Sequence, residues 1–137
     1  MGQVELEYLR SLDTLDIAEW RDLAVRSGNV FAAPEWLLTW WSHYGKGRSQ
    51  LIGVARNAGE LVAIMPLYEW WSRGVPLLRF IGHGPSDELG PICSSPRGAP
   101  ATAAVEELLE AIPIQRFVLL AENIGADQYL GESSNAR

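Results

Sequence analysis

The sequence is poor in cysteine, and Cys93 is the only one in 137 residues. A single cysteine cannot form a disulfide within the chain, and no second cysteine or nearby histidine completes a zinc-binding pattern. Cys93 also lacks an adjacent cation or a predicted helix N-terminus that would favour its thiolate form. We therefore expect a buried, unreactive thiol rather than a nucleophile, and no metal site.

Long hydrophobic runs are absent as well. Nowhere do 18 consecutive apolar residues occur, which a membrane-spanning helix would need. The first ten residues, MGQVELEYLR, alternate charged and apolar side chains, and this excludes the apolar segment of a secretory signal peptide. We therefore expect a soluble, cytoplasmic protein with no membrane span.

Basic residues are too few for a nucleic-acid-binding protein. The chain has 11 Lys and Arg against 17 Asp and Glu, and its formal net charge is −6. No excess of cations is left to neutralise phosphates, so we expect no nucleic acid among the partners.

Tryptophan, in contrast, is abundant, and three of the six lie in the stretch NVFAAPEWLLTWW, residues 29 to 41. Pro34 suits the first position of a helix and Glu35 suits the positive end of the helix dipole. The pattern predicts a helix over residues 34–44, with Gly45 as a left-handed cap.

Within this helix Trp36, Trp40 and Tyr44 are spaced four residues apart and share one face. Rings of this size fill a core or a domain interface, and one or two of them can instead line a ligand groove. Both alternatives stay open, and Trp36 and Trp40 are the candidates for substrate contact.

Other patterns predict the remaining elements. Asp16 and Glu19 form a capping-box pattern for a helix that Gly28 closes, and NAGE at 57–60 predicts a hairpin. Pro66 cannot donate to a ladder, so its strand must be at an edge or break its pairing there. The apolar face of the first helix comprises Ile17, Trp20, Leu23 and Ala24. Strands are expected at 4–8, 50–56, 61–68, 77–82, 89–93 and 116–123, and a further helix at 100–112.

This order predicts an α/β or α+β fold, with a mostly antiparallel sheet flanked by helices. The length fits a single domain over residues 1–123, followed by a polar tail at 124–137.

Three segments in this order resemble a known family: NVFAAPEWLLTWWSHYG, then LIGVARNAGELVAIMPLY, then LRFIGHGPSDELGP. They are similar to the N-terminal half of the CelD-like branch of the GNAT acyltransferase superfamily, which is related to the FemAB transferases. The distinctive parts are the P-E-W-L helix start, the Pro66–Leu67 pair, and Ser86–Asp87 followed by Gly90–Pro91. One departure is Ala33, which stands where the family often has a Ser or Thr cap.

The resemblance implies transfer of an acyl group from acyl-CoA, such as acetyl-CoA, to an amine or hydroxyl of a small-molecule or saccharide acceptor. It also implies a second GNAT-like half, supplied by another domain or by a homo-oligomer. The chain lacks the glycine-containing loop that holds the CoA pyrophosphate, because neither GKGR (45–48) nor GHG (82–84) fits that pattern. We therefore expect this piece to need its second half. The alternative is a noncatalytic binding or dimerisation module with a degenerate GNAT-like fold.

The loop GHGPSDELG, residues 82 to 90, is the best place for a site because a His, a Ser and an Asp lie together after a predicted strand. His83 has the chemistry of a base near neutral pH, and Asp87, with Ser86, could contact an acceptor. The alternative is a turn in which Ser86 and Asp87 bind their own backbone. Two consecutive tryptophans, Trp70 and Trp71, would point to opposite faces of a strand, and we expect at least one to be exposed.

Overall fold

The computed structural model describes residues 4–82, 90–93, 99–114 and 118–120. Its elements are β1 (Val4–Leu9), α1 (Ile17–Ser27), α2 (Pro34–Tyr44), β2 (Ser49–Asn57), β3 (Glu60–Ser72), β4 (Val75–Phe80), β5 (Ile92–Cys93), α3 (Ala99–Glu110) and β6 (Val118–Leu120). Two short 3-10 helices, η1 (Leu12–Thr14) and η2 (Val30–Ala32), flank α1. The expected polar tail lies outside the described residues.

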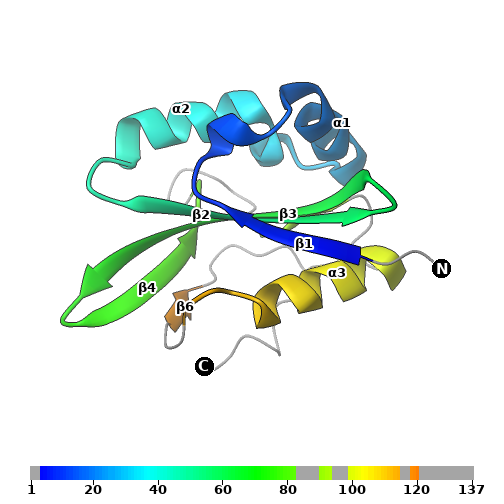
Figure 1. Ribbon diagram of the computed structural model, residues 1–137. Helices are drawn as coiled ribbons and strands as arrows, with labels where there is room; N and C mark the ends of the chain where they lie inside the picture. Colours follow the sequence, from blue (N-terminus) through cyan, green and yellow to red (C-terminus); the bar gives the residue numbers. More distant parts are fainter. Residues whose placement is uncertain (1–3, 83–89, 94–98, 115–117, 121–137) are drawn as a thin grey trace.

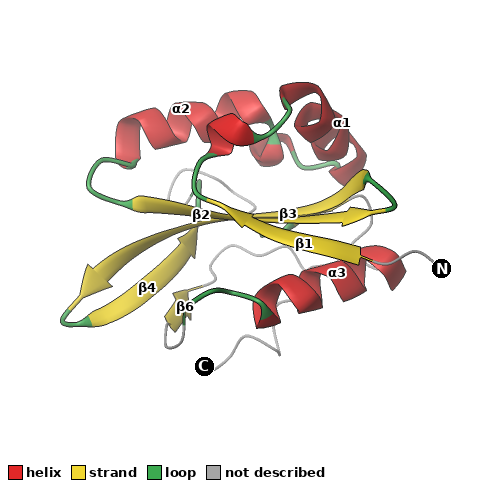
Figure 2. Ribbon diagram, in the orientation of Figure 1, coloured by secondary structure: helices red, strands yellow, loops and turns green. Residues whose placement is uncertain are grey.

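A single mixed sheet forms the middle of the molecule (Figures 1 and 2). Its strand order is β1-β2-β3-β4-β6, and β5 pairs separately with β3. All pairs are antiparallel except β4 with β6, which run parallel. The expectation of an α+β fold with a mostly antiparallel sheet is confirmed.

The helices cover the two faces of the sheet, with α1 and α2 on one side and α3 on the other (Figure 1). Each face has its own apolar core. The core under α1 and α2 includes Trp20, Leu37, Trp40, Ile64 and Tyr68. The core under α3 includes Leu51, Met65, Leu78, Phe80 and Leu108.

Helix α1 begins as predicted, because the Asp16 side chain accepts a hydrogen bond of 3.0 Å from the backbone N–H of Glu19. The Glu19 side chain, which would complete the capping box, makes a tertiary contact instead. Both carboxylate oxygens of Glu19 accept from Arg56 on β2, at 3.0 and 3.1 Å. Three of the four residues of the predicted apolar face, Trp20, Leu23 and Ala24, are buried, whereas Ile17 in the first turn of α1 is 40% exposed.

Helix α2 has the predicted bounds, and its N-cap Ala33 makes no side-chain capping bond. A hydrogen bond from Arg21 on α1 to Glu35 ties the two helices together and lowers the pKa of the Glu35 carboxyl. The prediction of a left-handed cap at Gly45 was wrong, because its φ is −84°. The glycine is needed there for space: a Cβ would lie 2.4 Å from ring atoms of Trp41.

The β2–β3 hairpin forms at the predicted place. Ala58 and Gly59 at its tip both have positive φ, 54° and 84°, as a type I′ turn requires. Arg73 and Gly74 repeat this geometry between β3 and β4. The β3–β4 hairpin projects at one end of the sheet (Figure 1).

Tyr8 connects the first strand to the last helix. Its hydroxyl donates a hydrogen bond of 2.7 Å to the carbonyl of Leu108 on α3. Burial raises the pKa of this hydroxyl, so it stays a donor across the physiological pH range.

Candidate functional site

A fork in the sheet opens beside Pro66. Strand β3 pairs with β5 at Ala63 and Ile64, and with β4 from Leu67 onward. Pro66 lies where β3 changes its neighbour from β5 to β4. Its carbonyl accepts a hydrogen bond of 2.8 Å from the N–H of Ile81, the residue just after β4.

Proline has no backbone N–H, and this explains why the fork is at Pro66. The nitrogen and carbonyl of a strand residue point to the same neighbour, so the Pro66 nitrogen faces the fork rather than β2. Pairing with β2 continues through Pro66, opposite Ile52. The sequence predicted that the strand of Pro66 either lies at an edge of the sheet or breaks its pairing at Pro66. The broken pairing is confirmed, and the edge position is wrong.

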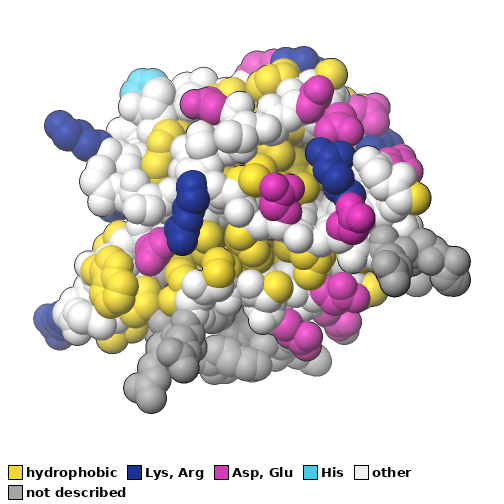
Figure 3. Space-filling view, viewed as in Figure 1, with side chains coloured by type: hydrophobic (Ala, Val, Ile, Leu, Met, Phe, Trp, Pro, Cys, Tyr) yellow, Lys and Arg dark blue, Asp and Glu magenta, His cyan; other side chains and the backbone are white. Residues whose placement is uncertain are grey.

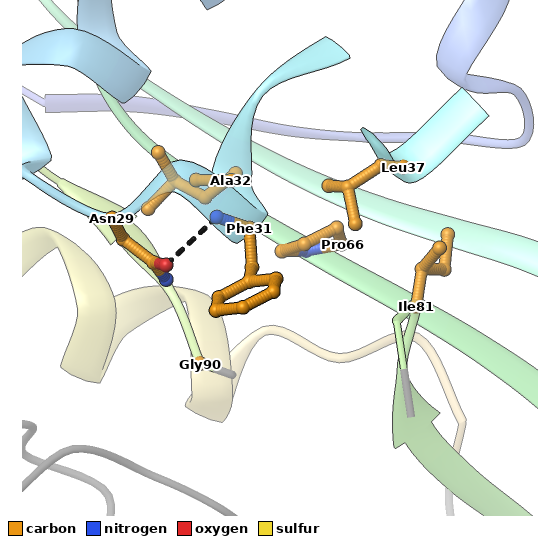
Figure 4. A pocket seen from close by; sticks show the side chains of 8 residues that line it. Asn29, Phe31, Ala32, Leu37, Pro66, Ile81 and Gly90 are labelled. Atoms are coloured by element: carbon orange, nitrogen blue, oxygen red, sulfur yellow. Dashed lines mark hydrogen bonds between the residues drawn. The ribbon is translucent and has the colours of Figure 1, made fainter. Parts of the chain in front are cut away.

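A small pocket occupies the fork (Figure 4). Its volume is about 10 Å³, room for about one water molecule. Phe31, from η2, points its ring into the space that Pro66 and Ile81 border. The Asn29 side-chain oxygen accepts a hydrogen bond of 2.9 Å from the backbone N–H of Phe31. The lining residues are Asn29, Phe31, Ala32, Leu37, Pro66, Ile81, Gly90 and Ile92.

The loop predicted to carry catalysis lies mostly outside the described residues, which include neither His83 nor Ser86 nor Asp87. Its two ends are described. Gly82 is buried two residues after the end of β4, next to Ile81 of the fork pocket, and Gly90 lines the same pocket. The two ends therefore place the start and finish of this loop at the fork, and the roles of its three polar residues stay predictions.

The two tryptophans predicted to contact substrate occupy different surroundings. Trp40 is only 4% exposed and packs with its ring centroid 5.3 Å from that of Tyr68. Trp36 is half-buried, and its ring forms a T-shaped pair with that of Phe31, with the two ring centroids 5.3 Å apart. Trp36 thus supports a wall of the fork pocket, whereas Trp40 lies in the core.

A second cluster lies further along β3, on the same face of the sheet as Pro66. The rings of Tyr68 and Trp70 stack with centroids 5.6 Å apart. The guanidinium carbon of Arg48 lies 5.4 and 5.5 Å from these two centroids, and that of Arg79 lies 5.2 Å from Trp70. We call Arg48, Tyr68, Trp70 and Arg79 the guanidinium–aromatic cluster.

Sequence reasoning missed this cluster. Arg48 belongs to GKGR, which was considered as a loop for the CoA pyrophosphate and rejected, and Arg79 is one residue of a predicted strand. The available signal was the spacing of Tyr68 and Trp70, which places both side chains on one face of a strand. Nothing in the local sequence indicated that a loop 20 residues earlier would supply a cation to that face.

Tyr68 is fully buried, and its hydroxyl finds no hydrogen-bond partner among the described residues. A buried hydroxyl without a partner costs about 1–3 kcal/mol. Tyr68→Phe removes the hydroxyl and keeps the ring, so we expect the free energy of unfolding to stay the same or rise by about 1 kcal/mol. Urea unfolding followed by circular dichroism measures this, and a loss above about 1 kcal/mol would show that the hydroxyl is satisfied.

The described residues contain no group of three His, Cys, Asp or Glu side chains that could hold a metal ion. Cys93, expected to be buried, is 4% exposed. Among the described helices, none is long and apolar enough to cross a membrane.

Comparison with known proteins adds no relative: no protein-family model, curated protein or solved structure matches the chain.

Proposed function

We propose that the chain is a GNAT-like acyltransferase domain, which acts with a second GNAT-like half to move an acyl group from acyl-CoA to an amine or hydroxyl. One observation carries the proposal. The three segments that resemble the CelD-like branch are far apart in sequence, yet each contributes to the fork pocket. Leu37 comes from the P-E-W-L helix, Pro66 from the Pro-Leu pair, and Gly90 from the Gly-Pro pair.

The small size of the pocket supports an incomplete site. Room for about one water cannot hold an acyl-CoA thioester, since ligand pockets commonly measure about 300–1,000 Å³. A second half that packs over the fork would enclose a larger volume. The amine or sugar acceptor would then approach from the loop that contains His83, Ser86 and Asp87.

Release of CoA from acetyl-CoA tests the proposal, with the chain alone and with its second half supplied, over a panel of amines and sugars. We expect release only from the complete assembly. If His83 is the base, His83→Ala lowers kcat by about 100-fold or more. The matched control is His43→Ala, which removes the only other histidine, an exposed residue at the end of α2.

Two results would contradict this assignment. A complete assembly that releases no CoA with any acceptor would overturn the proposed acyltransferase activity. An unchanged kcat in His83→Ala would overturn only the role of His83 as the base.

The alternative function, a noncatalytic dimerisation module, is favoured by the exposed tip of the β3–β4 hairpin. Trp71 is 63% exposed and Val75 is 41% exposed. Figure 3 shows hydrophobic side chains reaching the surface at this end of the molecule. Concentration-dependent sedimentation of an assembly that releases no CoA would support this second function.

A further inference from the structure

The guanidinium–aromatic cluster has the features of a ligand site separate from the fork. Its members come from three segments: Arg48 from the α2–β2 loop, Tyr68 and Trp70 from β3, and Arg79 from β4. The Arg48 guanidinium lies within 5.5 Å of two ring centroids, although the residue itself is exposed to solvent. The stacked rings therefore hold the cation at the surface.

Stacking of this kind leaves the hydrogen-bonding edge of a guanidinium available. A guanidinium that lies over a ring directs its N–H groups outward in its own plane, where they match the two oxygens of a carboxylate or phosphate. The rings also restrict the side chain, so less rotamer freedom is lost when a ligand binds.

The local charge favours an anion even though the whole chain carries −6. The segments 45–49 and 70–80, which supply the loop and the hairpin, contain four cations and no acidic residue: Lys46, Arg48, Arg73 and Arg79. The neighbouring acid on β3, Glu69, lies on the opposite face of the strand and contacts Arg10 at 3.6 Å.

Tyr68 contributes its ring and not its hydroxyl. Its ring is the one nearest to the Arg48 guanidinium carbon, and the residue itself is fully buried. The ring therefore supports the guanidinium from the protein side, and the exposed Arg48 makes the contact with the anion.

We propose that Arg48, held over the rings of Tyr68 and Trp70, binds a small molecule that presents a carboxylate or phosphate group. The inference goes beyond the proposed function, because it requires neither acyl-CoA nor a second half of the protein.

The test is isothermal titration of citrate and of pyrophosphate into the purified chain at low ionic strength, with folding checked by circular dichroism. Binding of citrate identifies a carboxylate ligand, and binding of pyrophosphate identifies a phosphate ligand. Arg48→Ala should weaken the binding by about 10-fold or more, and Arg48→Lys, which keeps the charge but loses the planar fork, by about 3-fold or more. Tyr68→Phe keeps the buried ring that supports Arg48, so it should change the binding by less than about 2-fold.

Lys46→Ala is the matched control. It removes one positive charge from an exposed residue of the same loop, two positions from Arg48, and should change binding less than about 2-fold. Equal losses in Arg48→Ala and Lys46→Ala would mean general charge attraction and would overturn the site. Failure of the folded chain to bind either anion would also overturn it.

Discussion

Replacing Trp20 with alanine should lower the free energy of unfolding by about 3–5 kcal/mol. The side chain is fully buried under α1 and donates a hydrogen bond of 2.8 Å from Nε1 to the carbonyl of Ala32. Alanine would leave a large cavity and an unpaired buried carbonyl. A domain of ordinary stability, about 5–15 kcal/mol, would lose a large share of its folding free energy.

Urea unfolding followed by circular dichroism measures this loss. Trp20→Phe separates its two causes, because phenylalanine fills much of the space but cannot donate to Ala32. It should cost about 1–3 kcal/mol. Trp71→Ala is the control, since removal of this exposed ring should change stability by no more than about 0.5 kcal/mol. A loss below about 1 kcal/mol in Trp20→Ala would mean that Trp20 does not anchor this face of the sheet.

Gly45→Ala should destabilise the protein by about 2–3 kcal/mol. The cost comes from contact and not from backbone strain, because φ −84° and ψ −6° are open to alanine. A Cβ would lie 2.4 Å from Cδ2 and Cε2 of Trp41 and 2.7 Å from the Trp41 carbonyl oxygen. The ring can rotate away, but the carbonyl belongs to the last turn of α2, so that turn must distort.

The control for this prediction is Gly47→Ala in the same loop. Gly47 has φ +80°, and a Cβ there would meet nothing within 4 Å, so its cost of about 1 kcal/mol is conformational alone. Thermal unfolding should give a lower Tm for Gly45→Ala than for Gly47→Ala. Equal midpoints would show that the end of α2 yields easily.

Local sequence predicted several elements because the interactions that form them are local. Asp16 binds a backbone N–H three residues ahead, and Pro34 restricts only its own φ and the backbone conformation of the residue before it. The turn of the β2–β3 hairpin likewise depends on two adjacent residues with positive φ.

The failures occurred where distant residues compete with local ones. Glu19 leaves its predicted partner at the helix start for Arg56, which is 37 positions away and bound through two hydrogen bonds. Gly45 was interpreted through its conformational freedom, whereas the folded chain uses its lack of a side chain beside Trp41. Pro66 had two allowed explanations, and only the partners of β3 distinguish them.

The candidate site divides in the same way. Residues 82–90 could be proposed as a candidate functional loop from their composition, because polar side chains that follow a predicted strand are visible in sequence. That Leu37, Pro66 and Gly90 meet in one pocket could not be derived from the sequence, since the meeting depends on how β4 and β5 divide along β3.

By itself, the sequence determined the class of this chain: an acidic α+β chain with a tryptophan-rich helix, a β-hairpin and a single cysteine. These features depend on composition, periodicity and short-range bonds. Only the tertiary structure decided where the sheet divides, that Trp40 lies in the core while Trp71 is exposed, and that Arg48 lies over Tyr68 and Trp70. The physical reason is that burial and stacking are set by residues far apart in the chain, whose positions exist only once the sheet and its helices have packed.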